Sequence, residues 1–301
     1  MESFPKIDRL ESRLGYDAVL EEKLDGSNFR FCLEEHLEEQ YHTNSRDIAF
    51  GSRNIAYKNE SDESNQFEDA IEFVKENASV DEIRAVEDEA AFTFFGEAME
   101  PNHLDYNWDE IPDFLGFDVY DMESETFLSP DEVADVFETI GVPVTPRVDR
   151  VQAGLAPAEI EELIPESEYA EYRAEGVILK DPREPRRRAK VVREDFKEVS
   201  PSPTTSEELP NDDTAEFFYT YFTEQRIQKT IYKLVREGDY DSPSMQMMQE
   251  LPHAVVCDVF EEEAENIVME NDLVIDTERL RELLGQRAPS ILRNTSVPES
   301  E

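Results

Sequence analysis

The chain has 301 residues, enough for one good-sized domain and a smaller second one. It carries 73 Asp and Glu against 29 Lys and Arg, a formal net charge of −44, yet 39% of its residues are hydrophobic. Because the apolar positions also follow strand and helix periods, the composition argues against an intrinsically disordered chain despite its charge.

The surface that this composition implies is rich in carboxylates and poor in lysine, since only 9 of the 29 basic residues are Lys. Salt screens the self-repulsion of such a surface, so we expect a halophilic protein from a high-salt cytoplasm that partly unfolds at low salt. The sequence has no signal-peptide apolar region at its N-terminus, and no stretch approaches the roughly 18 apolar residues of a membrane span. We therefore expect a soluble, cytoplasmic protein with no membrane partner.

The two cysteines give no indication of a disulfide or of a metal framework. Cys32 and Cys257 lie far apart in apolar runs, which predicts buried, reduced thiols. There is no C-x-x-C motif and no histidine cluster of the kind that binds zinc.

The first two hundred residues alternate short apolar strands with a few helices. Ser129, Pro130 and Glu132 form a helix start with an N-cap, a proline in the first turn and a capping box. Strands with few long crossover helices favour antiparallel sheets, so the predicted class is α+β. The predicted strands lie near 28–33, 91–97, 114–120, 176–180 and 189–193, and the predicted helices near 64–77, 129–141 and 157–164.

The remainder of the chain reads as helical. Residues 200–213 are rich in Pro, Ser and acidic residues and predict a linker. Beyond it, one helix is predicted from Phe218 to Leu234 before Gly238, followed by helices at 252–270 and 277–285. The predicted domains are 1–199 (catalytic), 200–213 (linker) and 214–301 (helical).

The most informative segment is Glu-Lys-Leu-Asp-Gly-Ser-Asn-Phe-Arg-Phe, residues 22–31. It places Lys23 in a tight turn that leads into the strand at 28–33. Gly26 allows the backbone to approach a ligand closely, and Ser27 and Asn28 offer short hydrogen-bonding side chains. A lysine in such a turn can act as a nucleophile when its neighbours lower its pKa.

This segment resembles motif I of the covalent nucleotidyltransferases, which include ATP-dependent DNA and RNA ligases and mRNA capping enzymes. The later motifs follow in the right order over residues 20–198. The nucleophile near the N-terminus and the short helical tail are most similar to the nick-sealing RNA ligases of the RNA ligase 2 type and their archaeal relatives. Residues 95–97 resemble motif III, and residues 117–120 resemble motif IIIa. Residues 175–180 resemble motif IV, and the strand around Lys190 lies where motif V is expected.

The resemblance implies an α+β, antiparallel-sheet nucleotidyltransferase (ATP-grasp-like ligase) domain followed by a small all-α domain. The implied activity is ATP-dependent RNA ligation, in which Lys23 takes AMP from ATP, AMP passes to a 5′-phosphate, and a 3′-hydroxyl displaces it. The implied cofactors are ATP and Mg²⁺ or Mn²⁺, and the implied partners are RNA ends or a nicked duplex. No obligatory protein partner is evident.

The resemblance also implies roles for single residues. Lys23 is the implied catalytic nucleophile and Glu175 the metal ligand. Phe117 would stack on adenine or, in the plainer reading, be a core aromatic, with Asp118 on the opposite strand face. Lys180 would contact the phosphates or form a surface ion pair with Asp181. The other implied nucleotide-binding residues are Glu22, Asn28, Arg46, Glu97 (to the ribose), Arg188 and Lys190.

Motif V departs from the family pattern of Lys-x-Lys. Lys190 matches one lysine, and the other is either Arg188, on the same strand face, or missing, with Val192 in its place. Arginine keeps the charge but is not an equivalent point donor. Six cations lie within 183–193 and predict a local basic groove for RNA or, alternatively, a solvated loop: Arg183, Arg186, Arg187, Arg188, Lys190 and Arg193.

Two alternatives remain open at this point. One is a DNA ligase or an mRNA capping guanylyltransferase, because the RNA branch often carries histidine where Asp25 stands. The other belongs to a different class, a non-catalytic RNA-binding protein with a degenerate ligase fold, for which the altered motif V is the best support.

Overall fold

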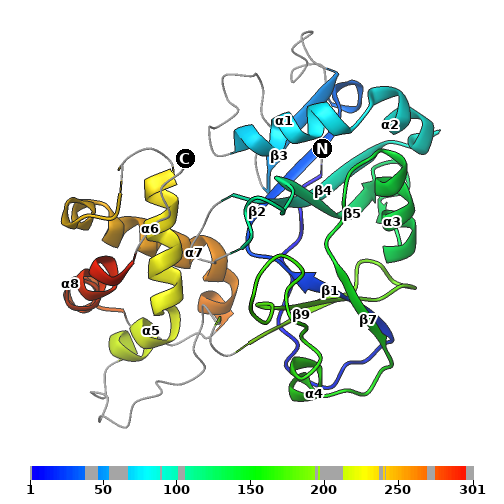
Figure 1. Ribbon diagram of the computed structural model, residues 1–301. Coiled ribbons are helices and arrows are strands. Elements are labelled where there is room, and N and C mark those ends of the chain that lie inside the picture. Colours follow the sequence, from blue (N-terminus) through cyan, green and yellow to red (C-terminus); the bar gives the residue numbers. More distant parts are fainter. Residues whose placement is uncertain are drawn as a thin grey trace. The chain divides into compact units, whose positions relative to one another are not determined.

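The computed structural model describes residues 2–37, 47–53, 67–88, 90–100, 106–193, 196, 213–236, 240, 242–269 and 275–295. The chain divides into two compact units, Met1–Arg193 and Glu194–Glu301 (Figure 1). Residues 200–212 of the predicted linker lie outside the described ranges, and Asp213 already begins a helix.

Two antiparallel sheets form the frame of the first unit. All strand pairs among the described strands are antiparallel, which confirms the predicted α+β class. The four-stranded sheet has the order β7-β1-β8-β9 and the five-stranded sheet the order β3-β2-β4-β5-β6. The strands are β1 (Ala18–Lys23), β2 (Ser27–Leu33), β3 (Ile48–Ser52), β4 (Phe92–Ala98), β5 (Phe114–Asp121), β6 (Thr126–Phe127), β7 (Arg147–Val151), β8 (Gly176–Lys180) and β9 (Arg188–Val192).

Helices cover one face of each sheet. On the five-stranded sheet, α1 (Glu68–Asn77), α2 (Val80–Glu87) and α3 (Pro130–Thr139) bury a core rich in phenylalanine, in which Phe31 stacks on Phe94 with ring centroids 4.7 Å apart. On the four-stranded sheet, α4 (Pro157–Glu161) contributes Ile160 to a core with Leu20 and Leu179. A single 3-10 turn, η1 (Glu34–His36), follows β2.

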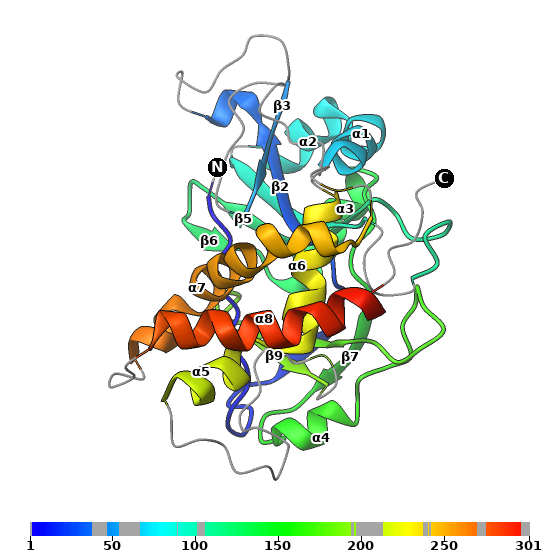
Figure 2. The ribbon, with the colours of Figure 1, turned by 90° about the vertical axis from the view of Figure 1, so that its left-hand side faces the viewer.

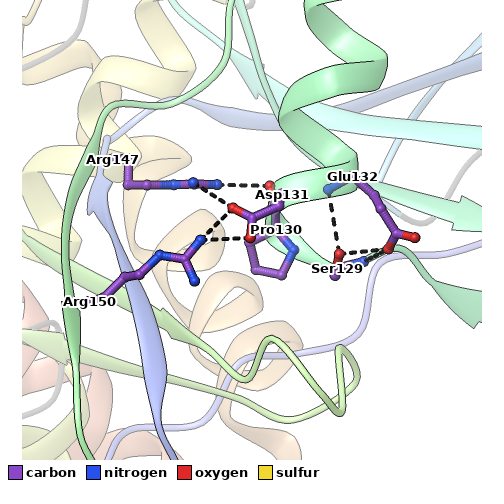
Figure 3. A network of polar contacts seen from close by, with 6 residues as sticks. All are labelled: Ser129, Pro130, Asp131, Glu132, Arg147 and Arg150. Atoms are coloured by element: carbon purple, nitrogen blue, oxygen red, sulfur yellow. Dashed lines mark hydrogen bonds and ion pairs between the residues drawn. The ribbon is translucent and has the colours of Figure 1, made fainter.

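The start of α3 shows the predicted capping box and a tie to the other sheet (Figure 3). The Ser129 backbone N–H donates to Glu132 Oε2 at 2.8 Å, and the Glu132 N–H donates to Ser129 Oγ at 3.4 Å. Asp131 in the same turn binds Arg147 and Arg150 of β7, at 2.8 and 2.5 Å. The helix that covers the five-stranded sheet is thereby fastened to the edge of the four-stranded one.

Among the described residues of the second unit, the regular elements are all helices. Figure 2 shows α8 running across α6, with which it packs. Its core is apolar and includes Phe222, Ile231, Leu284 and Ile291. Its elements are α5 (Asp213–Tyr221), α6 (Glu224–Arg236), the 3-10 helix η6 (Met245–Gln249), α7 (Leu251–Met269) and α8 (Thr277–Asn294).

Two helices differ from their predicted bounds. The helix expected from Phe218 to Leu234 is broken at 222–223, where Thr223 Oγ1 accepts from the Arg226 N–H at 3.4 Å and starts α6. The helix expected to end at 285 continues through Pro289 to Asn294, because its buried face supplies packing that outweighs local propensity. None of the helices in the described ranges is both long and apolar enough to cross a membrane.

Both cysteines are free, as predicted, but only Cys32 is buried. The prediction of burial is wrong for Cys257. The helical period of α7 turns Val255 and Val259 into the core and leaves Cys257 on the outer face.

Candidate active site

Lys23 is the last residue of β1, and the turn that follows it occupies residues 24–26. The prediction that Lys23 lies within the turn is therefore wrong by one residue, because Lys23 is the last residue of the strand before it. The turn carries the chain from the four-stranded sheet, which contains β1, to the five-stranded sheet, which contains β2. Lys23 thus lies at the passage between the two sheets.

The turn after Lys23 is held tightly in place. A Cβ atom on Gly26 would lie 2.5 Å from the Ala98 carbonyl oxygen and 2.6 Å from Glu97 Cγ, so only glycine fits. Glu97 Oε1 accepts a hydrogen bond from the Gly26 N–H at 3.3 Å, and Tyr106 Oη accepts one from the Asp25 N–H at 3.0 Å. Burial raises the pKa of Tyr106, so its phenol stays neutral beside the turn.

Lys23 forms an ion pair with Glu175, the residue just before β8. Lys23 Nζ lies 2.6 Å from Glu175 Oε2, and the two side chains are 21% and 9% exposed. The register of β1 against β8 sets Lys23 opposite Gly176, which brings the motif I lysine beside the motif IV glutamate. A carboxylate at this distance favours the ammonium form of lysine.

A cavity of about 190 Å³ opens beside Lys23, and both sheets line it. The four-stranded sheet contributes charged groups of both signs, whereas the five-stranded sheet contributes an aromatic ring, an amide and two carboxylates. Seven predicted site residues line this cavity together: Glu22, Lys23, Asn28, Glu97, Phe117, Lys180 and Lys190. The other lining residues are Phe4, Pro5, Ile7, Glu21, Leu24, Arg53, Asp118, Thr145 and Ile178.

Phe117 and Asp118 both line the cavity, although strand alternation predicts opposite faces for them. The pairing of β4 with β5 gives the reason. Phe95 pairs with Asp118 and Gly96 with Gly116, which leaves Phe117 as the extra residue of a β-bulge. Since a bulge breaks the alternation and re-aims a side chain, the predicted opposite faces are wrong.

Lys180 is the centre of a buried charge network beneath the cavity. Its Nζ lies 2.6 Å from Glu21 Oε2 and 3.4 Å from Asp118 Oδ1, and it also donates to the Phe117 carbonyl oxygen. The side chain is 3% exposed, so the alternative of a surface ion pair is wrong. Asp181, the proposed partner in that alternative, binds Arg187 instead.

Arg188 and Lys190 share a face of β9 but differ in what they reach. Lys190 lines the cavity, and Arg188 is not among the lining residues. The Arg188 guanidinium lies 3.1 Å from Asp118 Oδ1 and 3.9 Å from the centroid of the Phe127 ring, with the side chain 3% exposed. Arg188 therefore acts on the cavity through residues that line it, Asp118 and Phe4, whose ring centroid lies 5.4 Å from its guanidinium.

Glu22 is buried next to Lys23 and faces the loop that leads to β8. Its carboxylate accepts hydrogen bonds from Ser167 Oγ at 2.5 Å and from the Glu168 N–H at 3.1 Å. Burial raises the pKa of Glu22, and the Ser167 hydrogen bond opposes that rise. Glu22 thus fastens this loop, which also carries Glu175, to β1.

The predicted basic groove is not present as one row of free cations. Arg188 and Lys190 face inward, as described above, and the other four arginines of 183–193 each bind a partner within the first unit. The stretch is therefore a loop of paired arginines: Arg183 binds Asp17, Arg186 the Glu125 carbonyl, Arg187 both Asp181 and Glu184, and Arg193 the Arg173 carbonyl.

The acidic groups fit a cation that arrives together with phosphate. Among the described residues, no cluster of three or more His, Cys, Asp or Glu side chains is placed to hold a metal ion. Mg²⁺ typically binds one or two carboxylates, several waters and the substrate phosphates, so a preformed cage is not required. Glu175, beside Lys23 and 9% exposed, fits that role.

One basic residue of the cavity, Arg53, was not predicted from the sequence. Arg46 lies outside the described residues. Arg53 follows β3 and lines the cavity, where its Nε donates to the Phe4 carbonyl oxygen at 3.4 Å. Its position just after the short apolar run of Ile48 to Phe50 is the only feature of the sequence that indicates it.

A family model described as RNA ligase matches residues 17–192, more than half of the chain. No curated protein matches.

Three structures of a Naegleria gruberi RNA ligase share the fold, each with a TM-score of 0.50 and 16% identity. One is a lysine-to-alanine mutant with ATP and Mn (64% of this chain covered), and two are glutamate-to-alanine mutants, one with ATP and Mn and one with AMP and Mn (65% covered). This chain spans 57% of the length of each. The extent of the family match, over all the strands that build the cavity, shows that this chain belongs to the RNA ligase family.

Proposed function

We propose that this chain is an ATP-dependent RNA ligase that joins 5′-phosphate and 3′-hydroxyl ends through a lysyl-AMP intermediate on Lys23. The observation that carries the proposal is the Lys23–Glu175 ion pair at the edge of a cavity that also holds Lys180 and Lys190. Membership of the RNA ligase family supports it, as does the fold shared with a Naegleria ligase solved with ATP and Mn.

The first step is the attack of Lys23 on ATP. The neutral Nζ forms a bond to the α-phosphorus, the bond from that phosphorus to the bridging oxygen breaks, and pyrophosphate leaves with the electron pair. Lys180 and Lys190 supply positive charge for the phosphate oxygens. Because Lys180 is buried and bound to Glu21 and Asp118, its charge is fixed in position before ATP arrives.

Lys23 has to lose a proton before it can attack, and its ion pair with Glu175 opposes this loss. Glu175 is the residue that would hold Mg²⁺ or Mn²⁺, and such an ion, when bound, supplies positive charge that disfavours the ammonium form. Glu175 would therefore serve Lys23 as a counter-ion in the free protein and turn to the metal once ATP is bound.

The five-stranded sheet would bind the nucleoside. Phe117, half-buried on its bulge, offers a ring on which adenine can stack. Asn28 Oδ1 is buried and has no hydrogen-bond partner among the described groups, so an N–H or O–H of the nucleotide would satisfy it. Glu97 lies beside it on the neighbouring strand and would reach the ribose.

RNA enters in the next two steps, when its 5′-phosphate takes AMP from Lys23 and its 3′-hydroxyl then displaces AMP. A net charge of −44 opposes the approach of a polyanion, and molar salt weakens phosphate contacts further. Recognition of RNA would therefore depend on stacking and on hydrogen bonds to 2′-hydroxyls. The same charge supports a cytoplasm with high internal salt, where joining 5′-phosphate and 3′-hydroxyl ends would serve RNA repair.

The proposal is tested with ATP labelled at the α-phosphate and Mg²⁺ or Mn²⁺ in molar salt, followed by denaturing electrophoresis. We expect covalent label on the wild-type protein and none on Lys23→Ala. Lys233→Ala, on the exposed face of α6, is the matched control and should keep the label. Full labelling of Lys23→Ala would show that Lys23 is not the nucleophile.

The choice of nucleotide and nucleic acid distinguishes this proposal from the alternative functions. Labelling by GTP but not ATP would indicate a capping guanylyltransferase, and sealing of nicked DNA but not nicked RNA would indicate a DNA ligase. If the protein binds RNA but takes no covalent label from either nucleotide, it is a non-catalytic RNA-binding protein.

A further inference from the structure

We infer that residues 2–10, here called the N-terminal strap, are part of the nucleotide site and that Phe4 positions the Phe117 ring for the base. The inference deepens the proposed function and rests on it. The strap precedes the segment matched by the family model and contains none of the motifs. Three of its residues, Phe4, Pro5 and Ile7, nevertheless line the cavity.

The first half of the strap is bound to the five-stranded sheet. Arg30 of β2 donates to the Glu2 carbonyl oxygen, and Arg53 Nε donates to the Phe4 carbonyl oxygen at 3.4 Å. The Glu2 N–H lies 3.5 Å from Thr93 Oγ1 on β4. Arg30 of β2 and Arg53, just after the neighbouring β3, therefore hold the backbone on both sides of Ser3.

The second half of the strap is bound to the four-stranded sheet. The Lys190 N–H donates to the Asp8 carbonyl oxygen at 2.9 Å, and the Leu10 N–H donates to the Lys190 carbonyl oxygen at 3.0 Å. Arg9 thereby forms a parallel bridge with Lys190 along β9. The strap thus crosses from one sheet to the other at the cavity, and its far end fixes the backbone of a cavity lysine.

Phe4 is the residue through which the strap reaches the base-binding side. It is 8% exposed, and its ring contacts that of Phe117 edge-on, with centroids 4.9 Å apart and an interplanar angle of 67°. Behind it lie Phe95 at 5.1 Å and Phe127 at 6.1 Å. Phe4 therefore stands between the aromatic cluster of the sheet and the ring that faces the cavity.

The bulge explains why Phe117 needs such a neighbour. A residue within a regular ladder is oriented by its cross-strand partner, but Phe117 is the unpaired residue of the bulge. The edge-to-face contact with Phe4 supplies the packing that the ladder does not. Phe4 is therefore a positioning residue that acts through Phe117, and through it the strap sets the geometry of the base pocket.

The test compares two Phe→Leu substitutions at sites of similar burial. Phe4→Leu should raise the KM for ATP in lysine adenylylation about 3- to 10-fold, the range expected for one aromatic pair, and leave kcat within about twofold. Inhibition by inorganic tripolyphosphate should be unchanged, because the phosphate end of the cavity keeps Lys180 and Lys190. Phe92→Leu, 6% exposed in the core on the other side of the sheet, should leave the KM for ATP unchanged.

Binding of ATP to the Lys23→Ala protein, measured by calorimetry with and without Phe4→Leu, gives a readout that needs no catalysis. An unchanged Kd and KM in Phe4→Leu would overturn the strap inference while leaving the ligase proposal intact. ATP binding without covalent labelling of the wild type would overturn only the proposed chemistry. No ATP binding at all would overturn both. Should Phe4→Leu fail to fold, Ile7→Ala, also in the cavity wall and half-buried, should show a smaller rise in KM, and an unchanged KM there would count against the strap.

Discussion

Two networks of charge, one in each unit, each centre on a cation that is at most 3% exposed, and they differ in what surrounds that cation. In the first unit, Lys180 and Arg188 meet Glu21 and Asp118, and all four side chains are at most 8% exposed. Three of the four line the cavity beside Lys23. The charges of this network are therefore enclosed by protein on one side and open to a ligand on the other.

The network of the second unit is a structural tie between helices. Arg226 of α6 is fully buried and binds Asp258 Oδ2 at 2.7 Å and Glu263 Oε1 at 3.0 Å, both on α7. Around it lies the apolar core that includes Phe222 and Val259. This ion triad joins two helices that otherwise pack through apolar side chains.

The comparison shows that burial of a charge is by itself weak evidence of function. Both networks pair their charges, as burial in a low-dielectric interior requires. The difference is that Lys180 borders a cavity large enough for ligand groups and lies on the sheet that carries the nucleophile, whereas Arg226 is enclosed by helices. Substitutions in the two networks should accordingly change different measurements.

The largest effect is expected from Lys180→Met. Removal of one fixed cation at the phosphates should lower the rate of lysine adenylylation by about 10²- to 10³-fold. Because Glu21 and Asp118 would lose a partner, the variant should also melt earlier. The double variant Lys180→Met with Glu21→Gln removes both charges and should recover thermal stability but not activity, as followed by circular dichroism and by labelling. Recovery of both would make this network a structural tie like that of Arg226.

Arg226→Met should act on stability alone. It leaves Asp258 and Glu263 without their shared cation, and breaking a buried pair in this way costs about 3–5 kcal/mol. We expect the helices of the second unit to melt separately and earlier in circular dichroism, while adenylylation of Lys23 below that transition continues at the wild-type rate. A loss of adenylylation at temperatures where the helices remain folded would contradict the comparison.

Arg188 is intermediate between these cases, since it is buried in the first network but does not line the cavity. Arg188→Met should lower adenylylation about tenfold, because it leaves Asp118 to draw Lys180 away from the cavity, and should cost about 1–3 kcal/mol of stability. Arg187→Ser, on the same loop and 46% exposed, is the control and should change neither. Equal effects of the two substitutions would mean that the contact of Arg188 with Asp118 does not set the position of Lys180.

The sequence predicted those parts of the fold and of the candidate active site that depend on local sequence patterns. The order of the motifs, the strand around Gly176 and the capping box at Ser129 each follow from neighbouring residues. The meeting of Lys23 with Glu175 required the motif resemblance, because strand register is set by partners far away in the chain.

The parts that could not be predicted depend on tertiary contacts. Strand β1 was missed because Glu21 and Glu22 interrupt its apolar pattern, and they are buried only because Lys180 and Ser167 satisfy them. The bulge at Phe117 leaves no mark in the sequence, since it is a property of the pairing with β4. The N-terminal strap has no strand or helix period at all, and only its contacts with both sheets reveal it.

The smallest effect is expected from a third buried pair, His36 with Glu87, which joins η1 to the end of α2. The hydrogen bond that His36 Nε2 makes to Glu87 Oε2, at 2.8 Å, raises the pKa of His36 above its usual value, and the nearby Glu35 and Glu123 act in the same direction. A raised pKa in the folded state means that this stabilisation is complete below the unfolded pKa, about 6.5, and is lost as pH rises through the folded value. Melting temperatures of the wild type at pH 5.5 and pH 8.5 should therefore differ by more than those of His36→Gln, which has no such titration. If His36→Gln keeps the wild-type difference, other groups set the pH dependence and this pair is a neutral contact.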